Sequence, residues 1–237
     1  MWSQRVKGAV LLSALAMACG GRDAARDTAT STKPPSPAES PAVVDSAPAQ
    51  LDARRTILFL GTSLTAGLGL EPDSAYPQQI QRKIDASKLP YQVVNAGVSG
   101  ETSAGLLRRL DWVLRRPADV VVVETGANDG LRGLPVDATR ATIANVLARI
   151  RRERPDAKIL LVQMEAPPNL GPEYTSAFHA MFPELAREHG VSLLPFLLEG
   201  VAGEPRLNQS DGIHPNNQGE RIVAENVWRV LQPMLKS

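Results

Sequence analysis

A serine, an aspartate and a histidine in this chain occur in motifs that suit acyl transfer. Ser63 stands in Gly-Thr-Ser, and Asp211 and His214 stand three residues apart in Asp-Gly-Ile-His. Acyl transfer through serine needs a hydroxyl nucleophile, an imidazole base, a group that orients the base and donors for the developing oxyanion. Within one turn, the Asp211 carboxylate can bond the Nδ1–H of His214, which leaves Nε2 for the serine. The sequence therefore predicts Ser63 as nucleophile, His214 as base and Asp211 as the orienting group.

Two further motifs contain candidate oxyanion donors. Gly100 lies in Val-Ser-Gly-Glu-Thr and, having no side chain, can bring its backbone N–H close to a ligand. Asn128, in Thr-Gly-Ala-Asn-Asp-Gly, offers a side-chain amide. Together with the N–H of Ser63, these groups predict an oxyanion hole with three donors.

Each of these residues also has a structural interpretation. Ser63 can be a helix N-cap, and Asn128 can stabilise a turn, since Asn-Asp-Gly favours turns. Gly100 can be required because the backbone there has a positive φ, and this interpretation is compatible with a donor role. His214 can be a surface histidine before a proline, and Asp129 is expected to hold its loop. The occurrence of all the motifs in one chain favours the catalytic interpretation.

The elements that must position these residues alternate between strands and helices. Continuous apolar runs of strand length are typical of parallel strands that are covered on both faces. Amphipathic stretches of helical length separate them. The predicted strands are 56–60, 91–95, 119–124, 158–163 and 191–195, and the predicted helices are 75–87, 103–116, 138–153, 173–189 and 217–235. This alternation predicts an α/β fold with a doubly wound, flavodoxin-like parallel sheet of five strands.

In such a sheet, ligands bind beyond the carboxyl ends of the strands. Ser63, Gly100 and Asn128 each follow one of the first three predicted strands, and His214 precedes the last predicted helix. The fold therefore predicts that all four residues meet at one edge of the sheet.

The first residues are expected to lie outside the folded domain. Residues 1–18 combine basic residues with a short apolar stretch and small residues before Cys19. This pattern predicts a signal peptide, either of the lipoprotein type, with Cys19 cleaved to the new N-terminus and lipidated, or of the conventional type with an incidental cysteine. Residues 19–53 are rich in Ala, Pro, Ser and Thr without apolar periodicity, which predicts a disordered tether or plain spacer. The domain is then 54–237.

Composition narrows the function classes. The formal net charge is +1, which argues against a nucleic-acid partner. The chain has one cysteine and three histidines, so no disulfide framework or metal cluster is expected. The glycine spacings fit no nucleotide-binding loop. We therefore expect a monomer that needs no metal or cofactor, in which Arg108, Arg109, Arg115 and Arg116 form a solvated helix face.

The ordered motifs around Ser63, Gly100, Asn128, Asp211 and His214 resemble the SGNH (GDSL-type) hydrolase family over about residues 56–235. The segments 124–133 and 211–216 resemble its periplasmic branch of multifunctional thioesterases, lysophospholipases and arylesterases. The resemblance implies a three-layer SGNH fold and an esterase that acts on carboxylic esters or thioesters of single acyl chains. The N-terminal pattern of residues 1–19, in turn, predicts an exported protein of a bacterium, either periplasmic or anchored to a membrane through Cys19.

The resemblance further implies that the segment after the fourth strand is a mobile loop that contacts the acyl chain, with Met164, Pro167, Pro168 and Leu170 as its candidate contacts. A rigid connection is the alternative. One departure from the family is that Thr62 replaces the aspartate before the nucleophile. Two alternative functions stay open: a carbohydrate acetylesterase, and a catalytically weak, tethered module that binds acyl ligands.

Overall fold

The computed structural model describes residues 54–236. The predicted signal peptide at residues 1–18, the candidate lipidation site Cys19 and the predicted tether at residues 19–53 lie outside the described residues. Of the helices within residues 54–236, none combines the length and the apolar character that a bilayer span requires.

Five parallel strands form a single sheet in the order β2-β1-β3-β4-β5. Each arises from one of the apolar runs of the sequence, and β1 and β3 are buried almost throughout because helices cover both faces. The strands are β1 (Arg55–Gly61), β2 (Tyr91–Gly97), β3 (Val120–Glu124), β4 (Lys158–Val162) and β5 (Ser192–Leu194). Because β2 and β3 flank β1 on opposite sides, the strand order reverses at β1, and the crevice for a ligand is expected there.

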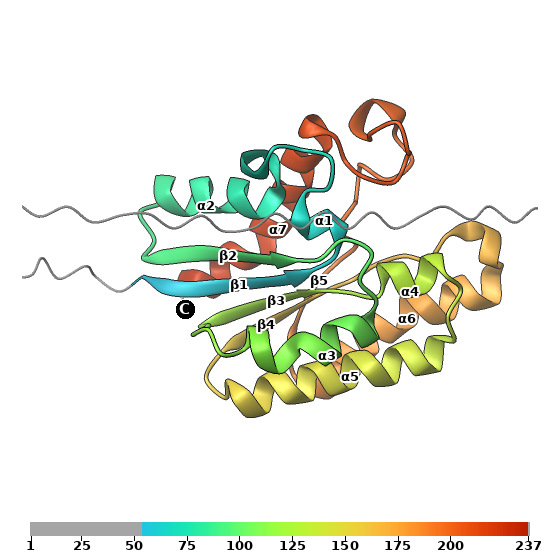
Figure 1. Cartoon of the computed structure of the whole chain (residues 1–237), viewed down its shortest axis with the longest axis horizontal. Helices are drawn as coiled ribbons and strands as arrows, with labels where there is room; N and C mark the ends of the chain where they lie inside the picture. Colours follow the sequence, from blue (N-terminus) through green and yellow to red (C-terminus); the bar gives the residue numbers. More distant parts are fainter. Residues whose placement is uncertain (1–53, 237) are drawn as a thin grey trace, which may run out of the picture. The chain divides into compact units, whose positions relative to one another are not determined.

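The helices form the two outer layers (Figure 1). One face of the sheet is covered by α2 (Tyr76–Ala86) and α7 (Asn217–Lys236). The other face is covered by α3 (Ser103–Val113), α5 (Val136–Glu153) and α6 (Pro172–His189). The predicted three-layer α/β fold is therefore confirmed, and each predicted element is matched to within three residues at its ends.

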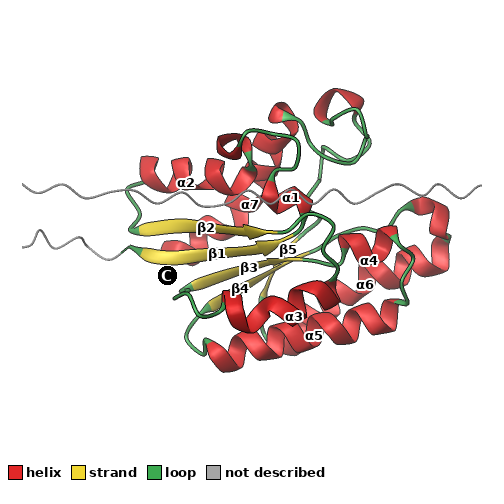
Figure 2. Ribbon diagram, viewed as in Figure 1, coloured by secondary structure: helices red, strands yellow, loops and turns green. Residues whose placement is uncertain are grey.

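Two short helices lie at the edge towards which the strand arrows point in Figure 2: α1 (Ser63–Ala66) and α4 (Ala127–Leu131). The register of the sheet explains why they are neighbours. Gly61 pairs with Gly97 of β2, and Leu60 pairs with Val123 of β3. The segments that follow β1, β2 and β3 consequently begin side by side, which brings the motifs around Ser63, Gly100 and Asn128 to one place.

Candidate active site

Ser63 is held in a tight turn at the end of β1, where it is buried and begins α1. Two glycines allow this turn to form. A Cβ on Gly61 would lie 1.9 Å from Thr65 Oγ1, and one on Gly97 would lie 2.4 Å from the backbone nitrogen of Ala66. Only glycine fits at both positions, because no real Cβ approaches other atoms so closely. The hydroxyl of Ser63 is thus fixed by close backbone packing of α1 on the end of β2.

His214 connects Ser63 to Asp211 through two hydrogen bonds. Its Nε2 lies 2.8 Å from Ser63 Oγ, and its Nδ1 lies 2.7 Å from Asp211 Oδ2. The loop that bears both residues is held by a bridge between Asn208 and Pro215 and by a bond from Gln209 N to His214 O. The arrangement predicted from the three-residue spacing is the one that the structure contains.

The Asp211 carboxylate is held in its charged form by donors from its own loop. Oδ1 accepts the backbone N–H groups of His214 and Ile213, at 3.0 and 2.9 Å. These bonds, together with the bond to the His214 side chain, lower the pKa of Asp211 to about 2. A carboxylate that is ionised at neutral pH and lies at Nδ1 can stabilise an imidazolium at His214, as a general base requires.

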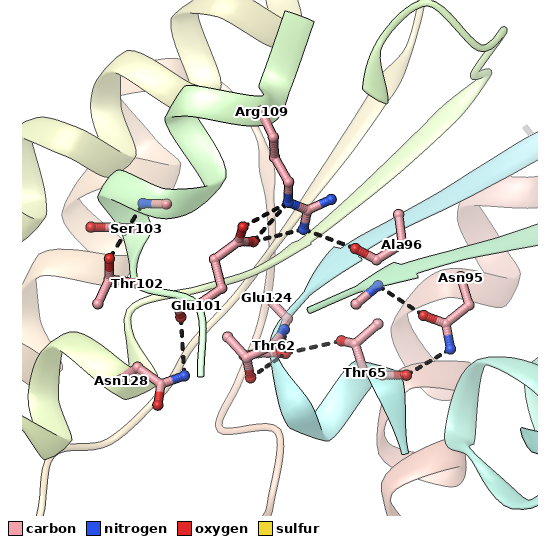
Figure 3. Close-up of polar contacts among 12 residues, drawn as sticks. Thr62, Thr65, Asn95, Ala96, Glu101, Thr102, Ser103, Arg109, Glu124 and Asn128 are labelled. Carbon is pink, nitrogen blue, oxygen red and sulfur yellow. Dashed lines mark hydrogen bonds and ion pairs between the residues drawn. The ribbon is translucent and has the colours of Figure 1, made fainter. Parts of the chain in front are cut away.

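Gly100 and Asn128 also come together, beside the loop that follows β2. Gly100 has a φ of +76°, and space is open where its Cβ would be. Asn128, on α4, donates from Nδ2 to the carbonyl oxygen of Glu101 at 3.0 Å, as Figure 3 shows. One of the two amide hydrogens is used in this bond, and the second remains for a ligand. Asp129 accepts the N–H and hydroxyl of Ser103, so its predicted role in holding the loop is confirmed.

A buried carboxylate supports the serine turn from within the sheet. Glu124, the last residue of β3, is fully buried and accepts the Thr62 N–H at 2.7 Å, the Thr62 hydroxyl at 3.0 Å and the Thr65 hydroxyl at 2.9 Å. None of residues 54–236 forms an ion pair with it, and burial raises its pKa despite these donors. Thr62, which replaces the family aspartate, is thereby a donor to Glu124 and not a second carboxylate beside it.

An apolar cleft of about 370 Å³ adjoins the serine and histidine. Met164, Pro167 and Pro168 line it, as predicted, and Leu64 and Ile213 bring it next to Ser63 and His214. Leu170 lies outside this lining: it ends a short 3₁₀ helix and its side chain would be 3.6 Å from a Cβ on Gly133. A larger hollow of about 490 Å³, around Pro117 and Pro155, lies near the opposite ends of the strands and contains none of the predicted residues.

Sequence reasoning missed three pairings around the site. Arg109 is not part of a solvated face, because it forms an ion pair with Glu101, with side chains only 18% and 10% exposed. Glu124 was identified only as part of a motif. His179 pairs with Glu165, 14 residues away in the sequence, since its Nδ1 lies 2.7 Å from Glu165 Oε1. The partners in all three cases are too distant in sequence, or too dependent on burial, for a local pattern to show.

No group of three or more His, Cys, Asp or Glu side chains within residues 54–236 is arranged to hold a metal ion.

A parallel sheet with a serine–histidine–aspartate chain at its carboxyl edge is an arrangement found in serine hydrolases. Comparison with known proteins agrees with this class. Residues 59–222 match the model of the GDSL-like lipase/acylhydrolase family, and the chain belongs to this family. As a member of it, the protein is an ester hydrolase.

Individual relatives match most of the chain. Esterase TesA of Pseudomonas aeruginosa is 40% identical over 188 residues, which cover 78% of this chain and 92% of the relative. Thioesterase 1/protease 1/lysophospholipase L1 of Escherichia coli strain K12 is 39% identical, covering 77% and 86%. The solved structure of psychrotrophic esterase EstA from Pseudoalteromonas sp., inhibited by monoethylphosphonate, matches with a TM-score of 0.72 at 33% identity, covering 77% of this chain and 100% of that chain.

Proposed function

We propose that this protein is a serine esterase that hydrolyses carboxylic esters and thioesters of single acyl chains through an acyl-enzyme. The observation that carries the proposal is the continuous chain of bonds from Ser63 Oγ to His214 Nε2, at 2.8 Å, and from His214 Nδ1 to Asp211, at 2.7 Å. Such contacts are within the reach that a nucleophile, its base and the group that orients the base require.

In the first half of the reaction, Ser63 Oγ attacks the carbonyl carbon while His214 Nε2 accepts the hydroxyl proton. The charge that develops on the imidazole is stabilised by Asp211, whose pKa of about 2 keeps it ionised at neutral pH. The carbonyl oxygen becomes an oxyanion, for which the N–H of Ser63, the N–H of Gly100 and the free amide hydrogen of Asn128 are the proposed donors.

In the second half, His214 returns its proton to the leaving alcohol or thiol, and the tetrahedral intermediate collapses to an acyl-Ser63 ester. Water then attacks this ester while His214 takes its proton. The bond to Ser63 Oγ breaks, His214 returns the proton to this oxygen, and the acid is released. Each step uses only residues of the segments that follow β1, β2 and β3 or precede α7.

The cleft supports an acyl group as the part of the substrate that is bound. Its lining is mainly apolar, from Leu64 on α1 to Leu131 on α4 and Phe196 after β5. An apolar cleft recognises the hydrocarbon chain by burial, at about 0.8 kcal/mol per CH₂ group. Esterase TesA of Pseudomonas aeruginosa and the thioesterase/lysophospholipase of Escherichia coli, as their names describe them, agree with such a substrate.

The test is hydrolysis of p-nitrophenyl esters by Ser63→Ala and His214→Ala, with Ser87→Ala, an exposed serine at the end of α2, as the matched control. We expect both variants to lose at least about 10³-fold in kcat and the control to retain native turnover. A phosphonate probe should label the native chain and the control but not Ser63→Ala. A protein that binds acyl ligands yet is never labelled would instead be the binding module.

A panel of esters from acetyl to palmitoyl, together with an acetylated sugar, tests the substrate class. The proposal predicts that kcat/KM rises with chain length until the cleft of about 370 Å³ is filled. A maximum at the acetylated sugar would instead identify a carbohydrate acetylesterase.

We also propose that the protein is exported and anchored through a lipid on Cys19, and that it is a monomer. The support is in the sequence, in which the only cysteine follows the apolar stretch of residues 8–18. Expression in a Gram-negative host should place the native chain in the membrane fraction with an acylated N-terminal cysteine, detected by mass spectrometry. Cys19→Ala should abolish the acylation, and light scattering should give the mass of one chain.

A further inference from the structure

The loop between β2 and α3, residues 98–102, is fastened by an ion pair. Glu101 accepts the Nε–H of Arg109 at 2.7 Å and an Nη2–H of Arg109 at 2.7 Å, so the pair is bidentate (Figure 3). The side chain of Arg109 is 18% exposed and that of Glu101 is 10% exposed. A bidentate, mostly buried pair is geometrically more specific and less screened than a surface pair. The pair is therefore a fixed part of this loop.

Arg109 also holds the other end of the same loop. Its Nη2 donates to the carbonyl oxygen of Ala96, the second-last residue of β2, at 2.8 Å. One guanidinium on α3 thus fastens both the end of β2, where the loop begins, and Glu101, near the end of the loop. Lysine could not do the same, because a single ammonium lacks the planar fork that serves both acceptors.

The loop that is fastened in this way contains one proposed oxyanion donor, Gly100, and contacts a second, Asn128 of α4. Gly100 directly precedes Glu101, and the Glu101 carbonyl oxygen accepts a hydrogen bond from Asn128 Nδ2 at 3.0 Å. The plane of the Asn128 amide, and hence the direction of its second N–H, depends on where this carbonyl lies. A shift of Glu101 would move the N–H of Gly100 and the amide of Asn128 together.

A glycine in α3 makes room for the Glu101 side chain. A Cβ on Gly105 would lie 2.7 Å from Glu101 Cγ. Gly105 is within α3 and has no positive φ, and at such a position glycine is normally less favourable than alanine. The glycine is explained by the space that Glu101 needs beside the helix.

We propose that Arg109 and Glu101 are positioning residues for the oxyanion hole: the pair fixes the loop that aims the Gly100 N–H and the Asn128 amide at the reacting carbonyl oxygen. The inference rests on the proposed function, in which these two groups are the donors. In a positioning role, loss of the ion pair lowers kcat more than it changes KM or the stability of the fold. In a purely structural role, loss of the pair lowers the stability of the fold first.

The test compares Arg109→Met with Arg108→Met. Arg108 is the adjacent arginine and is exposed, so the control removes the same charge from the same helix. We expect Arg109→Met to lower kcat about 10- to 100-fold, because displacing catalytic groups by about 1 Å costs that much. KM for a medium-chain ester should stay within about twofold, and the acid limb of the pH profile should not move, because His214 and Asp211 are untouched.

Gly105→Ala is a second variant that leaves the ion pair chemically intact. The added methyl group collides with Glu101, while alanine itself favours the helix. We expect kcat to fall about 10-fold without a fall in the thermal unfolding midpoint, and inactivation by a phosphonate probe to slow in proportion. A purely structural role predicts instead that kcat is lost only when the unfolding midpoint falls.

The outcomes separate the two proposals. If Arg109→Met and Gly105→Ala both turn over at the rate of Arg108→Met, the positioning role is overturned. If Arg109→Met does not fold, Gly105→Ala alone decides by the same criterion. Substantial activity in Ser63→Ala would overturn the proposed function itself. An inactive Ser63→Ala combined with a fully active Arg109→Met would overturn only the positioning role.

Discussion

Two carboxylates of the site, Asp211 in the histidine loop and Glu124 beneath the serine turn, are held in opposite ways. Asp211 accepts hydrogen bonds from the backbone N–H and the imidazole of His214. Glu124 accepts them from the backbone N–H of Thr62 and the hydroxyl of Thr65. The Asp211 side chain is 44% exposed and its pKa is lowered to about 2. Glu124 is fully buried and its pKa is raised. The same kind of donor therefore accompanies opposite shifts, and burial decides the sign.

The two carboxylates therefore have different tasks: Asp211 supplies a negative charge, and Glu124 supports the serine turn. The histidine loop keeps a charge near solvent, where ionisation is inexpensive and the charge can stabilise an imidazolium. The interior beneath Ser63 contains polar groups whose hydrogen bonds hold the serine turn in its conformation. We call this interior the buried floor; it consists of Thr62, Thr65, Tyr76, Glu124 and Glu220. Tyr76 connects it, since its OH bonds Thr65 and its N–H bonds Glu220 at 2.6 Å.

The largest expected effect comes from removing the charge on the exposed side. Asp211→Asn keeps the shape of the side chain but loses the anion that orients and stabilises the His214 imidazolium. We expect kcat to fall about 10³- to 10⁴-fold, while the free energy of unfolding changes by less than about 1 kcal/mol, as at most exposed positions. Ester hydrolysis and urea unfolding measure the two. A loss of stability as large as the loss of activity would contradict the division between charge and support.

The reverse pattern is expected on the buried floor. Glu124→Ala leaves the N–H of Thr62 and the hydroxyls of Thr62 and Thr65 buried without their acceptor. Since each unsatisfied donor costs about 1–3 kcal/mol, we expect the free energy of unfolding to fall by about 4 kcal/mol. Glu173→Ala, at an exposed glutamate in the first turn of α6, is the control. If Glu124→Ala unfolds at the same urea concentration as this control, Glu124 does not support the turn.

The comparison also shows what the sequence could predict. The strands and the exposed half of the site follow from local patterns: β3 begins with four consecutive valines, and Asp211 and His214 lie within one turn. The meeting of Ser63 with His214, 151 residues apart, followed from the rule that ligands bind at the carboxyl edge of a parallel sheet. These inferences need only periodicity and topology.

The support for the site was not predictable in this way. Glu124 follows four valines, and the sequence does not show that its side chain turns inward to three donors. Arg109 looks like Arg108 in the sequence, and only the path of the loop residues 98–102 distinguishes an ion-paired arginine from an exposed one. Buried polar contacts depend on side-chain direction in three dimensions, which a residue pattern does not contain.

A smaller effect is expected from Glu220, at the far side of the buried floor. Burial raises its pKa to about 8, against an ordinary value of 4.5. Between these values the native state binds more protons than the unfolded state, so Glu220 makes stability fall as pH rises. Glu220→Gln should remove about 2 kcal/mol of this decline between pH 5 and 7. Urea unfolding at both pH values measures it, and equal pH dependence in both proteins would show that Glu220 ionises normally.

The smallest effect is expected from Asp211 in acid, and its sign is opposite. Its folded pKa of about 2 lies below the ordinary value of 3.8, so the native state binds fewer protons than the unfolded state between these values. The stability that Asp211 contributes is present above about pH 4 and is lost as pH falls towards 2. Because the carboxylate is largely exposed, solvent reduces this contribution. Between pH 4 and 2 the unfolding midpoint of Asp211→Asn should therefore fall slightly less steeply than that of the native chain. A steeper fall in the variant would mean that the loop donors do not favour the ionised form of Asp211, and the contrast with Glu124 would then reduce to exposure alone.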